Sequence, residues 1–324
     1  MPPVDVSVVI VSYQTRDLLS CCLASLPAAA GNASWEAIVV DNGSRDGSPE
    51  MVRERFPRVR LFVAGDNPGF ARSTNLGLDQ ATGRTWVWLN PDCEMEPGSL
   101  AALVRYLDEH PEVGAVGPKL VSGDGTPQPS AQAFPSGARM LYHVLGVRRL
   151  AALPWARRAL RAVVPRSMKM TRSYLEALDP GSEPRRVDWI TGACLATPAH
   201  VARRVGPLDE SYFMYCEDTD WCHRVHDSGL EVHLLPGVQV IHRSGSSGPS
   251  NPLTAYHHYA SLMRYFRRYR PREFPLVRAF MMVTFAVRGI AGDVRRWAGR
   301  GGEHAWWRLA RLCWSPGRAL DRRA

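Results

Sequence analysis

The apolar positions of the first 120 residues form short runs, separated by segments in which apolar residues recur at helical spacing. Residues 6–11, 37–40, 86–89 and 113–116 are almost continuously apolar, which is typical of strands buried on both faces of a parallel sheet. Residues 59–63 alternate instead, which predicts a strand nearer an edge. This regular alternation predicts an α/β fold, a three-layer α/β/α sandwich around a mainly parallel central sheet.

The pattern changes after residue 125. Apolar periodicity returns at 187–195, which predicts one strand, and two further short strands are expected at 232–235 and 238–241. Helices are expected from residue 256 onward.

These changes predict the domain organisation of the chain. We expect one large α/β domain over residues 1–250, interrupted by a basic insertion at about 130–186. A basic, Trp- and Arg-rich helical region is expected over 251–324. The apolar run at 279–287 in this region is bracketed by Arg278 and Arg288, and we expect it to be too short to cross a bilayer.

Cysteine usage and the amino-terminal residues indicate the compartment. The seven cysteines are an odd number at irregular spacing, which favours reduced thiols over a disulfide framework. The first residues lack the basic and then apolar pattern of a signal peptide. We therefore expect a cytoplasmic protein. Two cysteines and two histidines within residues 216–226 fit no standard zinc motif, so we expect no zinc site there.

The net charge of +9 is unevenly distributed. Residues 139–172 carry nine Lys or Arg and no acid, and residues 253–324 carry fifteen Arg against four acids, so the rest of the chain is strongly acidic. Both basic segments are interleaved with Leu, Val, Phe and Trp. This composition favours an anionic membrane surface as partner and disfavours nucleic acid. The alternative is ordinary packing of an amphipathic C-terminal subdomain.

Polar side chains follow successive strands of the predicted sheet. Ser12 and Tyr13, Asp41, and the pair Asn90 and Asp92 each come at or just after a strand's carboxyl end. Ligands of open α/β sheets bind at that edge. A carboxylate there suits a divalent cation that carries a phosphorylated ligand, although acids after residue 91 also suit the start of a helix. No dinucleotide-binding or P-loop glycine motif is present.

Taken in order, these segments resemble family 2 glycosyltransferases of the GT-A fold, in particular their bacterial rhamnosyltransferase-like members. The matching motifs are VVIVSY at 8–13, VVDNGS at 39–44, NPGFA at 67–71 with NLG at 75–77, LNPD at 89–92, TGA at 191–193, EDTD at 217–220, and His242. As a set they are specific, and they run from residue 4 to about 248.

The resemblance implies roles on the donor side. Asp41 would accept a hydrogen bond from the base N3–H of a uridine or thymidine diphosphate sugar, with Ser12 and Tyr13 lining the nucleotide. Arg72 would lie near the diphosphate.

The resemblance also implies a metal site for Mg²⁺ or Mn²⁺. Asp92 fills the last place of the family's Asp-x-Asp motif, whose first place is taken here by Asn90, so Asp92 is the surer ligand. Asn90 remains a donor-binding candidate. His242 fits the second metal ligand, and the alternative for His242 is a purely structural role.

The acidic segment at 217–220 offers the general base that direct displacement requires. Asp220 has Arg224 four residues later, a natural helix ion pair, so we expect a structural role for it. Asp218 matches the family's catalytic aspartate, and Glu217 is the next candidate for the base. The alternative to a catalytic role is that these acids simply cap the helix.

Two further residues are expected on the acceptor side. Gly192 permits close backbone approach, and Trp189 lies three positions before it.

The sequence therefore predicts an inverting, metal-dependent glycosyltransferase of cell-envelope assembly. It would move a sugar, with L-rhamnose from dTDP-rhamnose as the expected donor group, to a lipid-linked or polysaccharide acceptor at the inner face of the plasma membrane. The alternatives are a UDP-sugar donor, a nucleotidyltransferase, or a catalytically dead membrane-binding module.

Overall fold

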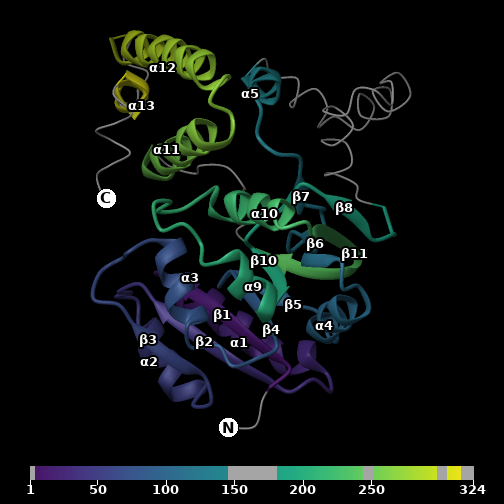
Figure 1. Cartoon of the computed structure of the whole chain (residues 1–324). Helices are drawn as coiled ribbons and strands as arrows, with labels where there is room; N and C mark the ends of the chain where they lie inside the picture. The colour runs from purple at the N-terminus through teal and green to yellow at the C-terminus, as the bar shows by residue number, and fades with distance from the viewer. Residues whose placement is uncertain (1–3, 145–180, 244–251, 298–304, 315–324) are drawn as a thin grey trace. The chain divides into compact units, whose positions relative to one another are not determined.

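Three of the buried apolar runs lie side by side as parallel strands. The computed structural model describes residues 4–144, 181–243, 252–297 and 305–314. In it, β1 (Val6–Ser12) pairs in parallel with β2 (Trp35–Asp41) and with β4 (Thr85–Leu89). β3 (Arg60–Val63) forms the edge beyond β2, as its alternating pattern predicts. The carboxyl ends of β1, β2 and β4 therefore meet at one edge of the sheet (Figure 1).

The other half of the nine-stranded sheet is mixed. β10 (Cys194–Pro198) runs antiparallel between β4 and β6 (Val113–Val121), and β11 (Glu231–His242) is parallel to β6. β5 (Cys93–Met95) and β8 (Arg185–Val187) are antiparallel to β11. Because β10 is reversed, its first residue pairs with the last residue of β4. The loop before β10 consequently lies at the edge where β4 ends.

Several strand boundaries differ from the expected ones. The expected strand at 187–195 is divided: β9 (Trp189–Ile190) pairs with β7 (Ala131–Gln132) in a separate small sheet, and a turn leads to β10. The two short strands expected at 232–241 are the single strand β11. Its register shifts between Leu235 and Gln239, because Pro236 and Gly237 form an irregularity in the strand and do not end it.

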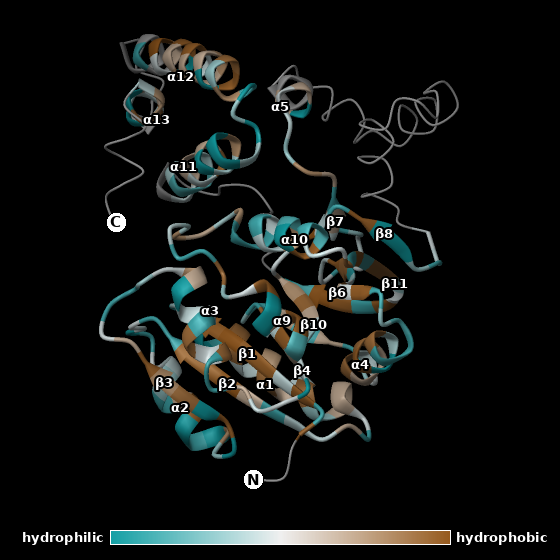
Figure 2. Ribbon diagram, viewed as in Figure 1, coloured by the Kyte–Doolittle hydropathy of each residue, from teal (hydrophilic) through white to brown (hydrophobic). Residues whose placement is uncertain are grey.

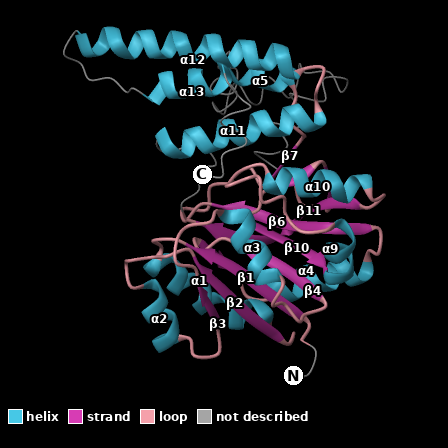
Figure 3. Cartoon of the chain, turned by 60° about the vertical axis from the view of Figure 1, so that its left-hand side comes forward, coloured by secondary structure: helices cyan, strands magenta, loops and turns pink. Residues whose placement is uncertain are grey.

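Helices cover both faces of the sheet, and each face has its own core. α1 (Arg16–Ala30), α2 (Ser48–Arg55) and α4 (Ser99–Glu109) pack on one face. α3 (Phe70–Leu78), α9 (Ala199–Val205) and α10 (Glu217–Asp227) pack on the other (Figure 3). This is the expected three-layer α/β/α arrangement, around a sheet that is mixed.

A second compact unit consists of C-terminal helices. α11 (Pro252–Tyr269), α12 (Phe274–Trp297) and α13 (Ala305–Trp314) enclose a third core, and α5 (Gly137–Val144) and residues 211–216 belong to the same unit. The domain limit at residue 250 stays a prediction. Most of the basic insertion expected at 130–186 lies outside the described residues.

α12 is much longer than the apolar run that predicted it. Its window Phe274–Ala291 is long and apolar enough to cross a membrane by length and composition, although core helices of soluble proteins pass the same test. The expectation that this segment is too short is therefore wrong. Phe274 to Val277 and Gly289 to Ala291 extend the apolar segment beyond the two arginines that bracket it.

Candidate active site

The nucleotide end of the site is built where β1 and β2 end. Ser12 and Asp41 are register partners, and both are fully buried. Oδ1 of Asp41 accepts hydrogen bonds from the N–H groups of Gly43 (3.1 Å) and Ser44 (2.7 Å). Oδ2 of Asp41 is buried and has no hydrogen-bond partner within the described structure. An unsatisfied buried carboxylate oxygen is costly, so this atom is suited to accept from a ligand N–H.

Tyr13 and Arg72, the other donor-side candidates, are more exposed. The Tyr13 ring is half-exposed just after β1. Arg72, on α3, lies 4.0 Å from Glu210 (Nε to Oε2), and both side chains are about half-exposed.

Asparagines brace the loops around this end. Asn67 accepts from Gly69 N–H (3.1 Å) and from the Asn42 side chain (3.0 Å). The side chain of Asn75 is hydrogen-bonded to both backbone groups of Leu208 (2.9 Å each).

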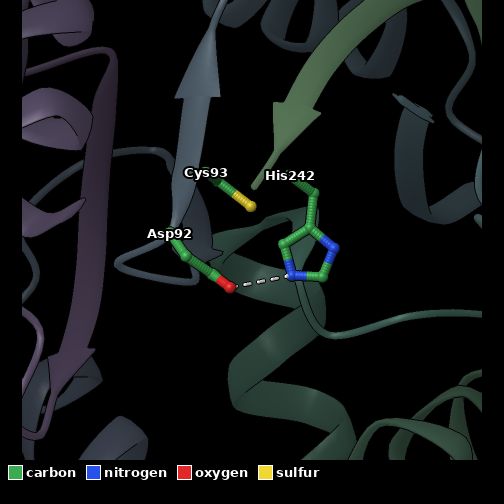
Figure 4. A group of neighbouring side chains, drawn as sticks. All are labelled: Asp92, Cys93 and His242. Atoms are coloured by element: carbon green, nitrogen blue, oxygen red, sulfur yellow. Dashed lines mark ion pairs between the residues drawn. The ribbon is translucent and has the colours of Figure 1, made fainter. Parts of the chain in front are cut away.

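Asp92 and His242 come together because β5 pairs with β11. Cys93 is opposite His242 in that ladder, and Arg243 N–H donates to the carbonyl of Asp92 (2.9 Å). As a result, His242 Nε2 lies 3.4 Å from Asp92 Oδ2. Figure 4 marks this ion pair with a dashed line. Both side chains are mostly buried. The two metal-ligand candidates, which are 150 positions apart in the chain, thus share one location.

Gln128 determines which nitrogen of His242 faces Asp92. Its amide N–H group donates to the His242 carbonyl (2.8 Å) and to Ser122 Oγ (2.9 Å). Its Oε1 lies 2.9 Å from His242 Nδ1, and an amide oxygen only accepts. Nδ1 therefore carries the proton in the neutral ring, which leaves the Nε2 lone pair directed at Asp92 and available to a metal ion.

Cys93 is the third member of this group. Asp92, Cys93 and His242 each offer one ligand atom, and these three atoms lie within 4.8 Å of one another. This is the only such group among the described residues. Cys93 is fully buried and its Sγ donates to the Ala193 carbonyl (3.4 Å). Burial, with the nearby Asp92 carboxylate, raises the pKa of this thiol well above its usual range. The remaining oxygen and nitrogen donors suit Mn²⁺ or Mg²⁺.

The base candidate Asp218 lies in the first turn of α10, against Gly192. Gly192 N–H donates to Asp218 Oδ2 (2.8 Å), and Thr219 donates to Oδ1 through its N–H (2.6 Å) and its hydroxyl (3.1 Å). Burial raises the pKa of Asp218, whereas these hydrogen bonds favour the ionised form and limit the rise. A Cβ at Gly192 would lie 3.4 Å from the Asp218 side chain, which is an ordinary van der Waals contact, so this approach does not itself require glycine.

The other two acids of this turn differ from Asp218. Glu217 is buried, and its Oε2 has no hydrogen-bond partner within the described residues. Burial and the adjacent Asp218 charge raise the pKa of Glu217 well above its usual range. Asp220 is fully buried and lies 3.0 Å from Arg224, which confirms the expected helix ion pair.

Backbone contacts place Asp218 close to the end of β4. Asn90 N–H donates to the Ala193 carbonyl (2.8 Å), and the preceding residue, Gly192, holds Asp218. Trp189 lies on β9, three residues before Gly192. Its indole N–H donates to the Ala133 carbonyl (3.1 Å). The polar groups predicted from strand ends and the acidic helix start therefore share one edge of the sheet.

Sequence reasoning missed two contributors to this edge. Gln128 lies in the polar segment after residue 125, where one glutamine among other polar residues gives no periodic signal. Arg243 forms an ion pair with Glu94 that ties the end of β11 to β5. The sequence signal that could have indicated this contact is the position of Arg243 directly after the candidate ligand His242.

Two solved structures share this architecture. Over 82% of this chain and 48% of the other, the fold superposes on GalNAc-T7, solved with UDP, GalNAc and Mn²⁺, with a TM-score of 0.54 and 15% identity. It also superposes on the mannosyltransferase PcManGT of Pyrobaculum calidifontis, solved with GDP-Man and Mn²⁺, over 96% and 86% of the two chains (TM-score 0.51, 18% identity). The fold is the GT-A fold.

Sequence comparison defines the family. Residues 7–154 match the family model described as Glycosyl transferase family 2. The N-acetylglucosaminyl-diphospho-decaprenol L-rhamnosyltransferase of Mycobacterium tuberculosis is 33% identical over 264 residues, which span 77% of this chain and 80% of that protein. The chain belongs to glycosyltransferase family 2 and is a glycosyltransferase. This membership disfavours the alternative of a nucleotidyltransferase.

Proposed function

We propose that this protein is an inverting, metal-dependent rhamnosyltransferase that moves L-rhamnose from dTDP-rhamnose to a lipid-linked saccharide. The observation that carries the proposal is the similarity to the mycobacterial rhamnosyltransferase, which extends over most of both chains. The name of that relative specifies both the sugar and a diphospho-decaprenol-linked acceptor.

The base of the donor would bind at the end of β2. The unpaired Asp41 Oδ2 would accept from the N3–H of thymine, with Ser12 and Tyr13 lining the nucleotide. Uracil presents the same N3–H, so a UDP-sugar is the second candidate donor. Arg72, on α3, would lie near the diphosphate.

Asp92 and His242 would hold the metal ion. Both structural neighbours were solved with Mn²⁺ and a nucleotide, and here an oxygen and a nitrogen donor lie 3.4 Å apart. When bound, the cation supplies positive charge to the departing diphosphate. Asn90 would remain on the donor side, and Gln128 would keep the Nε2 lone pair of His242 available.

Asp218 would act as the general base. The acceptor hydroxyl oxygen forms the new bond to the anomeric carbon, its proton passes to Asp218, and the bond between that carbon and the diphosphate oxygen breaks to release dTDP. Attack opposite the leaving group inverts the anomeric configuration. Gly192 and Trp189 would form the acceptor side, and Glu217 is the second candidate for the base.

The acceptor sets the place of the reaction. A saccharide on a lipid diphosphate is confined to a membrane, and the basic segments of this chain suit the anionic inner face of the plasma membrane.

The test is transfer from dTDP-[¹⁴C]rhamnose to a lipid-diphosphate GlcNAc acceptor, with and without Mn²⁺ after EDTA treatment. Asp218→Asn is expected to lower kcat by about 10²- to 10⁴-fold and to leave dTDP affinity unchanged, since it removes only the base. Asp227→Asn, an exposed acid on the same helix, is the matched control. Unchanged turnover in Asp218→Asn contradicts the base assignment, and transfer only from UDP-sugars contradicts the donor.

A further inference from the structure

One face of α12 is apolar and exposed to solvent. Leu276, Val283, Val287 and Ile290 are 76%, 58%, 59% and 55% exposed. Their spacings of seven, four and three residues place them on a single helix face, which we call the outer stripe. In Figure 2, brown hydrophobic segments recur along this helix, with hydrophilic segments between them.

The opposite face of α12 already has a packing partner. Val277, Met281 and Phe285 are buried in the core with α11 and α13. At Gly289, a Cβ would come within 3.0 Å of the Trp307 ring, so α13 packs directly on the helix backbone. The outer stripe is therefore additional to what the fold needs, and contiguous exposed apolar surface of this kind marks an interaction site.

The contacts of α12 oppose insertion across a bilayer. Arg278 donates to the last carbonyls of α13, those of Cys313 and Trp314 (2.7 Å each). Near the other end of α12, Asp293 accepts from the Trp307 indole N–H (2.9 Å). A helix that crossed the membrane alone would lose these bonds and the core behind it, and would carry Arg278 and Arg288 into the hydrocarbon.

The charges of this unit identify the partner. Six arginines among its described residues are exposed: Arg267, Arg268, Arg288, Arg308 and Arg311 on the helices, and Arg272 in the turn between α11 and α12. Both acids of its described residues are hydrogen-bonded and only partly exposed, Glu273 to Gly137 N–H and Asp293 to Trp307. Such a surface attracts anionic lipid headgroups, whereas two copies of it repel each other.

We propose that α12 lies flat on an anionic bilayer, with the outer stripe in the boundary between headgroups and acyl chains. Exposed Trp314 lines a groove of about 260 Å³ with Ala279 and Met282, which continues the stripe. An indole ring at this position suits the headgroup level. The proposal gives the surface through which the enzyme would reach the membrane of its acceptor, and in that respect it rests on the proposed function.

The test uses the full chain and sedimentation with vesicles of phosphatidylcholine alone or mixed equally with phosphatidylglycerol. The wild type is expected to bind the anionic vesicles and to be released by alkaline carbonate. Replacing Leu276, Val283 and Val287 together by Ser should weaken partitioning by about tenfold or more, because apolar area buried in the interface is lost. Leu76→Ser, an exposed apolar residue on α3, is the control, and Val283→Glu is a second variant that leaves the inner face intact.

Each outcome decides the proposal. Equal binding of wild type and both stripe variants overturns it, as does carbonate-resistant binding, which indicates a crossing helix. Stripe variants that abolish self-association by light scattering but keep vesicle binding show that a second copy covers the stripe. Transfer to a water-soluble acceptor without vesicle binding refutes only this inference, whereas vesicle binding without any transfer refutes only the proposed function.

Discussion

At the scale of single residues, the sharpest feature of the site is a carboxylate with one oxygen in use and one unused. Asp41 Oδ1 holds the turn at Gly43 and Ser44, and buried Oδ2 has no partner in the described structure. Asparagine has the same shape and keeps one oxygen for the turn, but it presents an N–H₂ donor where Oδ2 stands. The Asp41→Asn substitution therefore keeps the oxygen that holds the turn and replaces only the oxygen that we assign to the nucleotide base.

Asp41→Asn is expected to lower dTDP affinity by roughly 10- to 100-fold, because a charge-assisted hydrogen bond to N3–H is lost. Cytosine has an acceptor at N3, so CDP should bind the variant better than it binds the wild type. Titration calorimetry with both nucleotides measures this. Unchanged dTDP affinity would show that Oδ2 does not contact the base.

The pH dependence of turnover tests the surroundings of Asp218. Burial raises the pKa of this carboxyl above its ordinary value, and the base must be ionised, so activity should fall as pH drops through the raised pKa. Thr219→Val removes a hydrogen bond that favours the ionised form. The acid limb of kcat/KM should then move to higher pH with its plateau retained. Thr219→Ser keeps the hydroxyl and should leave the acid limb in place. An acid limb that does not move in either variant would show that it does not report the ionisation of Asp218.

At the scale of elements, α10 carries the base candidate at one end and is braced in its middle. Buried Asp220 pairs with Arg224, whose guanidinium also donates to the carbonyls of Val205 and Pro207 (2.8 Å each). One arginine thus ties α10 to the end of α9 and the loop after it.

Arg224→Met is expected to lower the free energy of unfolding by about 3–5 kcal/mol, because Asp220 loses its arginine while still buried. Urea denaturation followed by circular dichroism measures the change. Adding Asp220→Asn to this variant should restore part of the stability, since no charge is then left in the core. A loss below 1 kcal/mol would mean that water or another group replaces the arginine.

The predictability of each element follows from how local its signal is. Buried parallel strands are continuous apolar runs, so β1, β2 and β4, with the polar residues that end them, were predicted from sequence. The direction of β10 has no local signature, because periodicity is the same in either sense. Pro236 and Gly237 usually interrupt a strand, yet here pairing with β6 resumes at Gln239. The site followed the same rule: Asp92 and His242 each end a run, whereas Gln128 contributes only through tertiary contacts.

At the scale of the whole molecule, the chain contains two compact units with separate cores. The α/β unit holds two of them, one on each face of its sheet, and α11, α12 and α13 enclose the third. Asp41, Asp92, Asp218 and His242 all belong to the α/β unit. A donor nucleotide bound by these residues would stabilise that unit.

Calorimetry of the full chain is therefore expected to show two unfolding transitions, of which dTDP and Mn²⁺ move only one. Ligand at about 100 times its Kd adds roughly 2.7 kcal/mol, which should raise the melting temperature of the α/β unit by about 5–10 °C. In Asp92→Ala, dTDP should shift this transition equally with and without Mn²⁺, because the carboxylate proposed to hold the ion is gone. Equal movement of both transitions would show that the two units unfold as one, and a Mn²⁺ effect that persists in Asp92→Ala would place the metal elsewhere.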